Sequence, residues 1–119
     1  MQIELHTTDL SLSEAIREYI DRRTGFAFSR VQDRVRRVAI HLSDINGPRG
    51  GIDKRCSVQV HLRSAPSVIV EEADADVYVL LDRALARAGR VVTKRIERSH
   101  SLQRVRQASL DVAMTDGRV

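Results

Sequence analysis

Residues 76–98 read DVYVLLDRALARAGRVVTKRIER, a stretch with the 3.6-residue period of an α-helix. At this period the apolar side chains share one arc of the helix, which predicts that the arc packs on the protein core. The arc consists of Val77, Leu81, Ala84, Leu85, Ala88, Val91 and Val92, with Tyr78 and Ile96 at its edge. A neighbouring side carries five cations spaced three or four residues apart. This cationic ridge consists of Arg83, Arg87, Arg90, Lys94 and Arg98.

The cationic ridge stands out against the charge of the rest of the chain. Residues 83–106 contain eight Lys or Arg and one acidic residue, whereas residues 1–82 contain eleven basic and thirteen acidic residues. Soluble surfaces usually mix the two signs. The ridge is therefore typical of a surface that binds a polyanion, and the alternative interpretation is an ordinary solvated helix face.

Length and composition limit the class of protein. A chain of 119 residues suits one domain whose core needs neither a metal nor a disulfide. It has no run of about 18 apolar residues and no basic-then-apolar N-terminus, so we expect a cytoplasmic protein without membrane contact. The single cysteine, Cys56, has no partner for a disulfide or a CxxC pair and is expected in the core.

Four stretches of alternating apolar and polar residues predict β-strands at residues 2–7, 35–44, 56–63 and 68–72. Their predicted inward side chains are Ile3, Leu5, Val38, Ile40, Leu42, Cys56, Val58, Val60, Leu62, Val68 and Val70. A helix capped by Ser11 or Ser13 follows the first strand, and Gly25 could end it. Its predicted apolar face is Leu12, Ala15, Ile16, Tyr19, Ile20 and Ala27.

The resulting order, β-α-β-β-β-α, predicts an α+β fold with a four-stranded sheet and two helices packed on one face. The first two strands should be parallel neighbours, because a helix connects them. Residues 44–55 read as a long hairpin loop rich in Gly, Pro, Asn and Asp. Residues 101–119 are expected to form a C-terminal extension, partly helical and then disordered beyond about Ala108. Arg95 falls within the apolar arc, so either the second helix has run past the sheet edge there, which we favour, or the side chain lies with its stem along the core.

The sequence gives weaker evidence for a metal site, a phosphate-binding loop or an enzyme active site. His6, His41 and His61 share the outward parity of three strands, so a metal site is one alternative and a set of solvated histidines is the other. Residues 47–51 are glycine-rich but lack the Lys-Ser/Thr pair of a phosphate-binding loop. Neither a Ser/His/Asp set nor paired carboxylates emerge, so we expect no enzyme and no cofactor.

The segment EADADVY at residues 72–78, the run SEAIR at residues 13–17 and the element order resemble the ribosome hibernation promoting factor family, also called ribosome-associated inhibitor A. The resemblance covers about residues 1–100 and corresponds to a short form that lacks the C-terminal dimerisation domain. It implies a non-enzymatic stress-response factor that occupies the messenger and tRNA channel of the small ribosomal subunit and blocks translation.

The resemblance also implies that basic residues of both helices contact ribosomal RNA. The matching positions are Arg17, Arg22, Arg23, Arg83, Arg87, Arg90 and Lys94. Arg98 from the ridge and Arg49, Lys54 and Arg55 from the hairpin loop complete the predicted RNA-binding set. Residues 25–28 (GFAF) depart from the family's Lys-rich helix end, and Arg95 replaces a usually apolar residue. The alternative is a self-associating module, in which the open sheet face or the edge strand at residues 68–70 binds a second copy as a weak homodimer.

Overall fold

A four-stranded sheet in the order β1-β2-β3-β4 forms the base of the molecule. The computed structural model describes residues 1–45 and 53–116, with side chains up to Arg98. The strands are β1 (Gln2–Thr8), β2 (Val35–Asp44), β3 (Lys54–Leu62) and β4 (Val68–Asp74). β1 and β2 pair in parallel, and the other neighbours pair antiparallel. The predicted loop at residues 46–52, with Arg49, lies outside the described residues.

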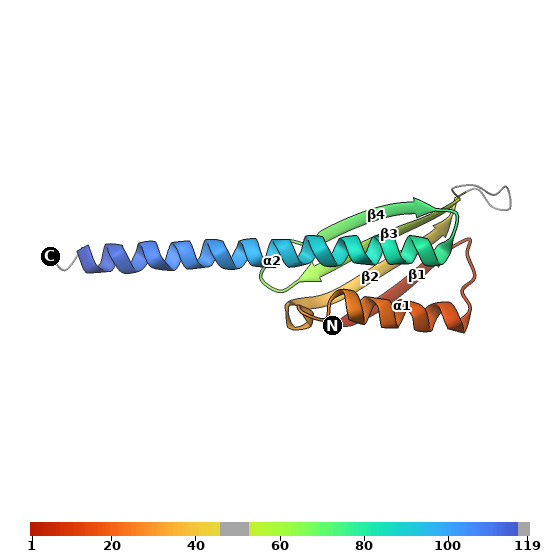
Figure 1. Ribbon diagram of the computed structural model, residues 1–119, viewed down its shortest axis with the longest axis horizontal. Coiled ribbons are helices and arrows are strands. Elements are labelled where there is room, and N and C mark those ends of the chain that lie inside the picture. The colour runs from red at the N-terminus through yellow and green to blue at the C-terminus, as the bar shows by residue number, and fades with distance from the viewer. Residues whose placement is uncertain (46–52, 117–119) are drawn as a thin grey trace.

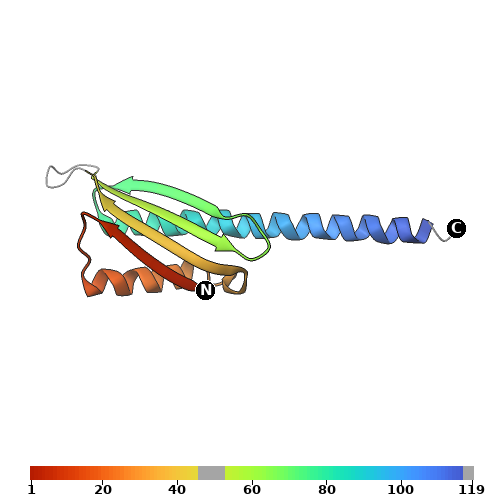
Figure 2. The ribbon, with the colours of Figure 1, turned by 180° about the vertical axis from the view of Figure 1, so that it is seen from behind.

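Two helices cover the same face of this sheet. Helix α1 (Glu14–Ala27) connects β1 to β2 through the short 3-10 turn η1 (Gln32–Arg34), and α2 (Val77–Asp116) follows β4. The helices lie in front of the strands in Figure 1 and behind them in Figure 2, where the view is reversed. The predicted α+β fold, with its β-α-β-β-β-α order and parallel first pair, is confirmed.

The start and end of α1 follow from local chemistry. Ser13 is the N-cap, and its hydroxyl accepts a hydrogen bond from the Ile16 N–H at 3.2 Å, as the preference for serine at this position predicts. Gly25 does not end the helix, which continues to Ala27 and is followed by the fully buried Phe28. Ala15 was predicted on the apolar face, but it is exposed, while Thr24 is buried.

The core lies between the sheet and the two helices. Nine of the eleven predicted inward strand residues are buried, and Ile3 and Leu5 on the edge strand β1 are partly buried. On α2 the buried residues are Leu80, Leu81, Ala84, Leu85, Ala88, Val92 and Ile96, with Gly89 beside them. The sequence missed Leu80, and Tyr78 is more exposed than predicted because the buried arc is centred closer to Leu81 and Leu85.

Acidic side chains cap the start of α2. The Asp76 carboxylate accepts hydrogen bonds from the N–H groups of Tyr78 and Val79, at 2.8 and 3.2 Å. The Asp74 carboxylate accepts one from the Asp76 N–H at 2.9 Å. Carboxylates in this position satisfy the free N–H groups and favour the helix dipole.

Other boundaries differ from the predictions. Helix α2 continues to Asp116, past Ala108, and extends beyond the end of the sheet (Figure 1). Lys54 and Arg55 belong to β3 rather than to the hairpin loop. The expected overhang at Arg95 is wrong, because this half-buried side chain donates to the carbonyl oxygens of Ser67 and Pro66, at 2.7 and 3.3 Å. Arg95 therefore joins α2 to the turn between β3 and β4.

Candidate nucleic-acid interface

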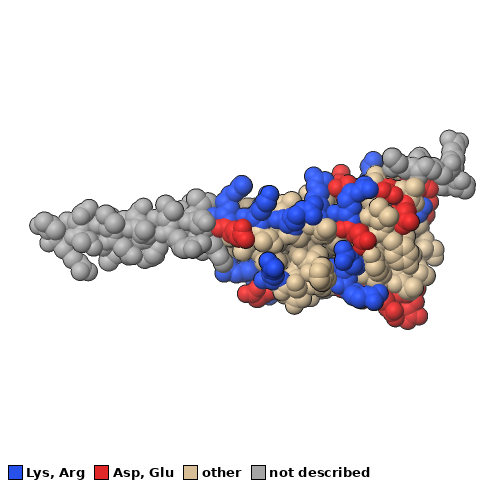
Figure 3. Space-filling model, viewed as in Figure 1, with Lys and Arg blue, Asp and Glu red and all other residues tan. Residues whose placement is uncertain are grey.

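The cationic ridge forms a continuous exposed row on α2. Arg83, Arg87, Arg90, Lys94 and Arg98 are all exposed, and Figure 3 shows Lys and Arg side chains in a line over this helix. Acidic side chains gather beside the end of the line that is closer to the start of α2 (Figure 3). The two ends of the ridge therefore differ in their electrostatic surroundings.

The first half of the ridge is paired with carboxylates of β4. Arg83 lies 2.9 Å from the Asp74 carboxylate, and Arg87 lies 3.0 Å from that of Glu72. Both carboxylates face the helices because Glu72 and Asp74 share the inward parity of Val70 on the strand. A phosphate that bound either arginine would have to compete with a carboxylate already in place.

The second half of the ridge has no such partners. Among the described residues, Arg90, Lys94 and Arg98 form no ion pair. The difference arises because α2 runs antiparallel to β4. Arg87 lies beside Glu72 near the end of the strand, and Arg95, about two turns further along α2, contacts Ser67 in the turn before the strand. The part of β4 beside the second half therefore offers the apolar residues Val68 and Val70. Three cations of the ridge remain available for an external anion.

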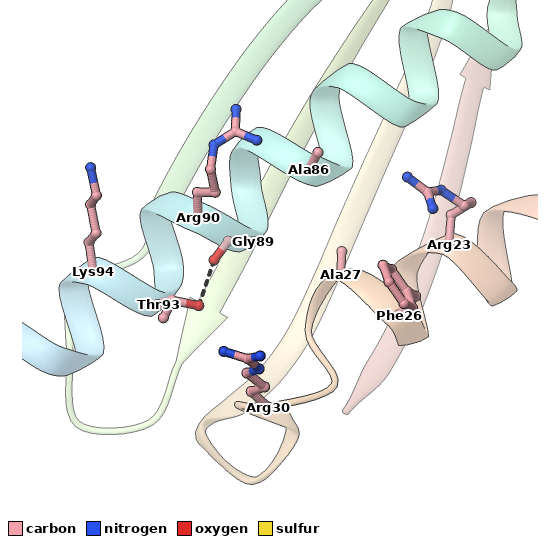
Figure 4. A pocket seen from close by; sticks show the side chains of 9 residues that line it. All are labelled: Arg23, Phe26, Ala27, Arg30, Ala86, Gly89, Arg90, Thr93 and Lys94. Atoms are coloured by element: carbon pink, nitrogen blue, oxygen red, sulfur yellow. Dashed lines mark hydrogen bonds between the residues drawn. The ribbon is translucent and has the colours of Figure 1, made fainter.

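A groove of about 460 Å³ lies between two of these cations, Arg90 and Lys94, and the end of α1. Figure 4 shows Arg23 and Phe26 on α1, Arg30 on the segment after it, and Arg90, Thr93 and Lys94 on α2. The remaining lining residues are the small Ala27, Ala86 and Gly89. The groove thus combines an apolar floor with a cationic rim.

Close contact between the two helices forms the floor of the groove. A Cβ atom at Gly89 would lie only 2.7 Å from the backbone oxygen of Ala27, closer than real Cβ contacts allow. Glycine is therefore the residue that lets α2 approach the end of α1 so closely. Beyond this contact, Phe28 turns into the core and is fully buried, whereas Phe26 is 73% exposed at the groove.

A polar cluster fixes one side of the rim. The Tyr19 hydroxyl donates a short hydrogen bond to Asp82, and the Arg23 Nε atom lies 3.0 Å from the same carboxylate. The hydrogen bond to Asp82 raises the pKa of Tyr19 above its ordinary value, with partial burial adding to the effect. The Tyr78 ring packs edge-on against Tyr19, with ring centroids 4.9 Å apart. The cluster joins α1 to α2 and holds Arg23 beside Phe26.

The comparisons with known proteins show the family and the fold of the chain. Residues 3–100 match the family model described as sigma 54 modulation protein / S30EA ribosomal protein. The chain belongs to this family. The match confirms the resemblance to the hibernation factors, and it covers the sheet, α1 and the ridge-bearing part of α2. Comparison with curated proteins finds no match.

Two solved structures share the fold. The N-terminal domain of Protein Y from Thermus thermophilus has 33% sequence identity and a TM-score of 0.65, with 79% of this chain and 98% of that chain covered. A ribosomal subunit interface protein from Coxiella burnetii has a TM-score of 0.67 and covers 79% of this chain and 96% of its own. At 18% identity, the second similarity is evidence of a common fold alone.

The structure of this S30EA family member separates the predicted RNA-binding residues into groups. Arg23, Arg90 and Lys94 line the groove. Arg17 and Arg22 are exposed on α1 outside the groove lining. Lys54 lies 3.2 Å from Asp53, and Arg55 is exposed with the outward parity of Ser57, so neither is in the groove. The predicted set is therefore not one surface.

Phe26, Arg30 and Thr93 line the groove, together with Ala86 and Gly89, but the sequence pattern did not predict them as site residues. The sequence GFAF at residues 25–28, which replaces the Lys-rich helix end of the family, could have pointed to Phe26. Two phenylalanines two positions apart cannot both point into the core from one helix end, so one of them had to be exposed. Arg30 gave no local signal. It reaches the groove only because the chain turns between α1 and η1 (Figure 4). The Thr93 hydroxyl donates to the Gly89 carbonyl at 2.8 Å.

The three outward histidines do not form one cluster. His6 and His41 are register partners with ring centroids 6.5 Å apart, and the Thr8 hydroxyl hydrogen-bonds His41. His61 is the partner of Arg37, four residues further along the sheet, and hydrogen-bonds that side chain. In the described part of the chain, no three His, Cys, Asp or Glu side chains could hold a metal ion. The three-histidine metal site is therefore wrong.

Two further features bear on the chemistry of the chain. Cys56 is buried in the core as predicted, and burial raises the pKa of its thiol to about 12. The thiol therefore stays protonated near neutral pH. Within residues 1–45 and 53–116, no helix is long and apolar enough to cross a membrane.

Proposed function

We propose that this chain is a non-enzymatic ribosome hibernation factor that binds small-subunit ribosomal RNA through the surface shared by α1 and α2. Membership of the family described as sigma 54 modulation protein / S30EA ribosomal protein supports ribosome association. A ribosomal partner would place the protein in the cytoplasm, and blocking translation under stress is the activity expected of such a factor.

The observation that carries this proposal is the set of unpaired cations around the groove. Among the described residues, Arg30, Arg90 and Lys94 lack ion-pair partners and lie on the rim of one groove. RNA phosphates attract cations that are not already neutralised, and each neutralised phosphate adds to the salt dependence of binding. If these three and Arg98 each contact one phosphate, the logarithmic salt slope should be roughly −2.8 to −3.6.

The proposal is tested by co-sedimentation of the full chain with small ribosomal subunits and by inhibition of translation in vitro. The double variant Arg90→Glu with Lys94→Glu should weaken co-sedimentation roughly a hundredfold or more, because it removes two phosphate contacts and introduces repulsion. The matched control, Arg36→Glu with Arg63→Glu, changes the same net charge at exposed sites outside both the groove and the predicted RNA-binding set. This control should lose less than about fivefold.

Three results would contradict the proposal. Equal losses in both double variants would mean diffuse attraction to the whole protein. Wild-type protein that leaves subunits unbound and translation unaffected would exclude ribosome association. A mass in size-exclusion chromatography that rises with concentration, together with absent ribosome binding, would favour the self-association alternative, for which Ile69 offers a 62% exposed apolar side chain on the edge strand β4.

A further inference from the structure

Phe26 is the most exposed large apolar side chain among the described residues, at 73%. It does not pack on the core because Phe28, two positions later, occupies the core below the end of α1. Instead Phe26 stands at the groove with the Arg23 guanidinium 5.6 Å from its ring centre (Figure 4). Since Arg23 forms an ion pair with Asp82, which also accepts a hydrogen bond from Tyr19, the ring has a fixed neighbour on one side and an open surface elsewhere.

The groove beside Phe26 has two chemical zones. Its floor, made by Ala27, Ala86 and Gly89, is apolar, and its rim carries Arg30, Arg90 and Lys94. A volume of about 460 Å³ lies in the range of small-molecule sites. A nucleotide matches these zones, since its base has apolar faces and its phosphate is an anion. Stacking of bases on aromatic rings is the usual way in which proteins hold single-stranded nucleic acid.

We infer that the groove binds one unpaired nucleotide of single-stranded RNA, with its base stacked on Phe26 and its flanking phosphates held by Arg30, Arg90 and Lys94. The inference rests on the proposed function and specifies which kind of RNA the surface recognises. A base inside a duplex is covered on both faces by its neighbours, so Phe26 cannot stack on it. The site therefore distinguishes unpaired from paired RNA, which the cationic ridge alone does not.

The test compares two probes by fluorescence anisotropy with the full chain. One probe is a single-stranded oligoribonucleotide roughly 12 nucleotides long, within the site sizes of single-strand binders, and the other is a duplex RNA of the same length. Phe26→Ala should weaken single-strand binding roughly 5- to 100-fold, as expected for the loss of one stacked base. Duplex binding should change less than about twofold, and the salt slope for either probe should stay the same.

Two variants separate stacking from general effects. Phe26→Tyr keeps an aromatic ring and should retain single-strand affinity. Arg90→Ala should weaken both probes and flatten both salt slopes by about 0.7 to 0.9 units. Because Phe26 is exposed, the melting temperature of each Phe26 variant should match that of the wild type, so a loss of binding will not reflect unfolding.

The inference is overturned if Phe26→Ala leaves single-strand affinity unchanged, if it weakens both probes equally, or if the wild type binds neither probe. These failures differ from failure of the proposed function. Wild-type protein that co-sediments with small subunits while Phe26→Ala has no effect on either probe retains the proposed function without the stacking site. Discrimination between the probes without any ribosome binding would retain the site and reject the ribosome as target.

Discussion

The two halves of the cationic ridge have the same residue types at the same helical spacing but different electrostatic surroundings. Arg83 and Arg87 form ion pairs with Asp74 and Glu72 on β4, whereas Arg90, Lys94 and Arg98 form no ion pair with any described residue. The difference arises because β4 carries acids at one end of its helix-facing side and valines at the other. A row of cations in a sequence is therefore not yet a row of cations available to a ligand.

The comparison predicts that Arg90→Ala weakens RNA binding far more than Arg87→Ala does. Arg90→Ala should reduce affinity for small subunits about fivefold to tenfold near 0.1 M salt and flatten the salt slope by nearly one unit, because one phosphate contact is lost. Arg87→Ala should reduce affinity less than about twofold and leave the slope unchanged. Binding isotherms at several salt concentrations measure both quantities.

The effect of the same two variants on the free energy of unfolding should rank in the opposite order, and this measurement is the control. Arg87→Ala breaks an ion pair with Glu72 in which Arg87 is 52% exposed, so the free energy of unfolding should fall by less than about 1 kcal/mol. Arg90→Ala should leave it unchanged. If the two variants lose RNA affinity equally, the carboxylates of β4 do not shield the first half and the comparison fails.

Removing the carboxylate that pairs with Arg87 should make this arginine as available to RNA phosphates as the cations in the second half of the ridge. Glu72→Gln leaves Arg87 without its carboxylate partner, so RNA affinity should rise about twofold to fivefold and the salt slope should become steeper. The matched control is Glu71→Gln, which changes the same charge at the adjacent exposed position of opposite parity. This control should have less than half the effect on affinity. An equal gain in both variants would indicate a response to net charge alone.

The smallest expected effect is a pH dependence of folding from Asp74. The hydrogen bond from the Asp76 N–H, together with the nearby Arg83 charge, lowers the pKa of Asp74 below its ordinary value of 3.8. A lowered folded-state pKa adds stability above the ordinary pKa, and this stability is lost as pH falls through the folded value. Asp74→Asn should therefore lose less stability than the wild type between about pH 5 and pH 2, as measured by urea unfolding. Parallel pH curves would contradict this assignment.

Local patterns in the sequence were sufficient to predict most of the fold. The alternation in the strands correctly identified the inward side chains of β2 and β3, because strand parity depends only on position along the chain. The period of α2 located the buried arc and the exposed ridge for the same reason. The neighbouring residues limited the cap of α1 to Ser11 or Ser13, and the structure shows that it is Ser13. The errors on the ridge-bearing part of α2, at Leu80 and Arg95, concern how the helix rotates and extends against the sheet.

What the tertiary structure alone decided is which charged and aromatic side chains act together. Arg87 and Glu72 are 15 positions apart, and the groove joins Phe26 to Arg90 across 64. The sequence determined that α2 has a cationic side, that the chain resembles the hibernation factors and that residues 25–28 are unusual. It could not determine which cations are neutralised or that Phe26 lines a groove, because ion pairs and cavities depend on the distances between elements, and local periodicity carries no information about those distances.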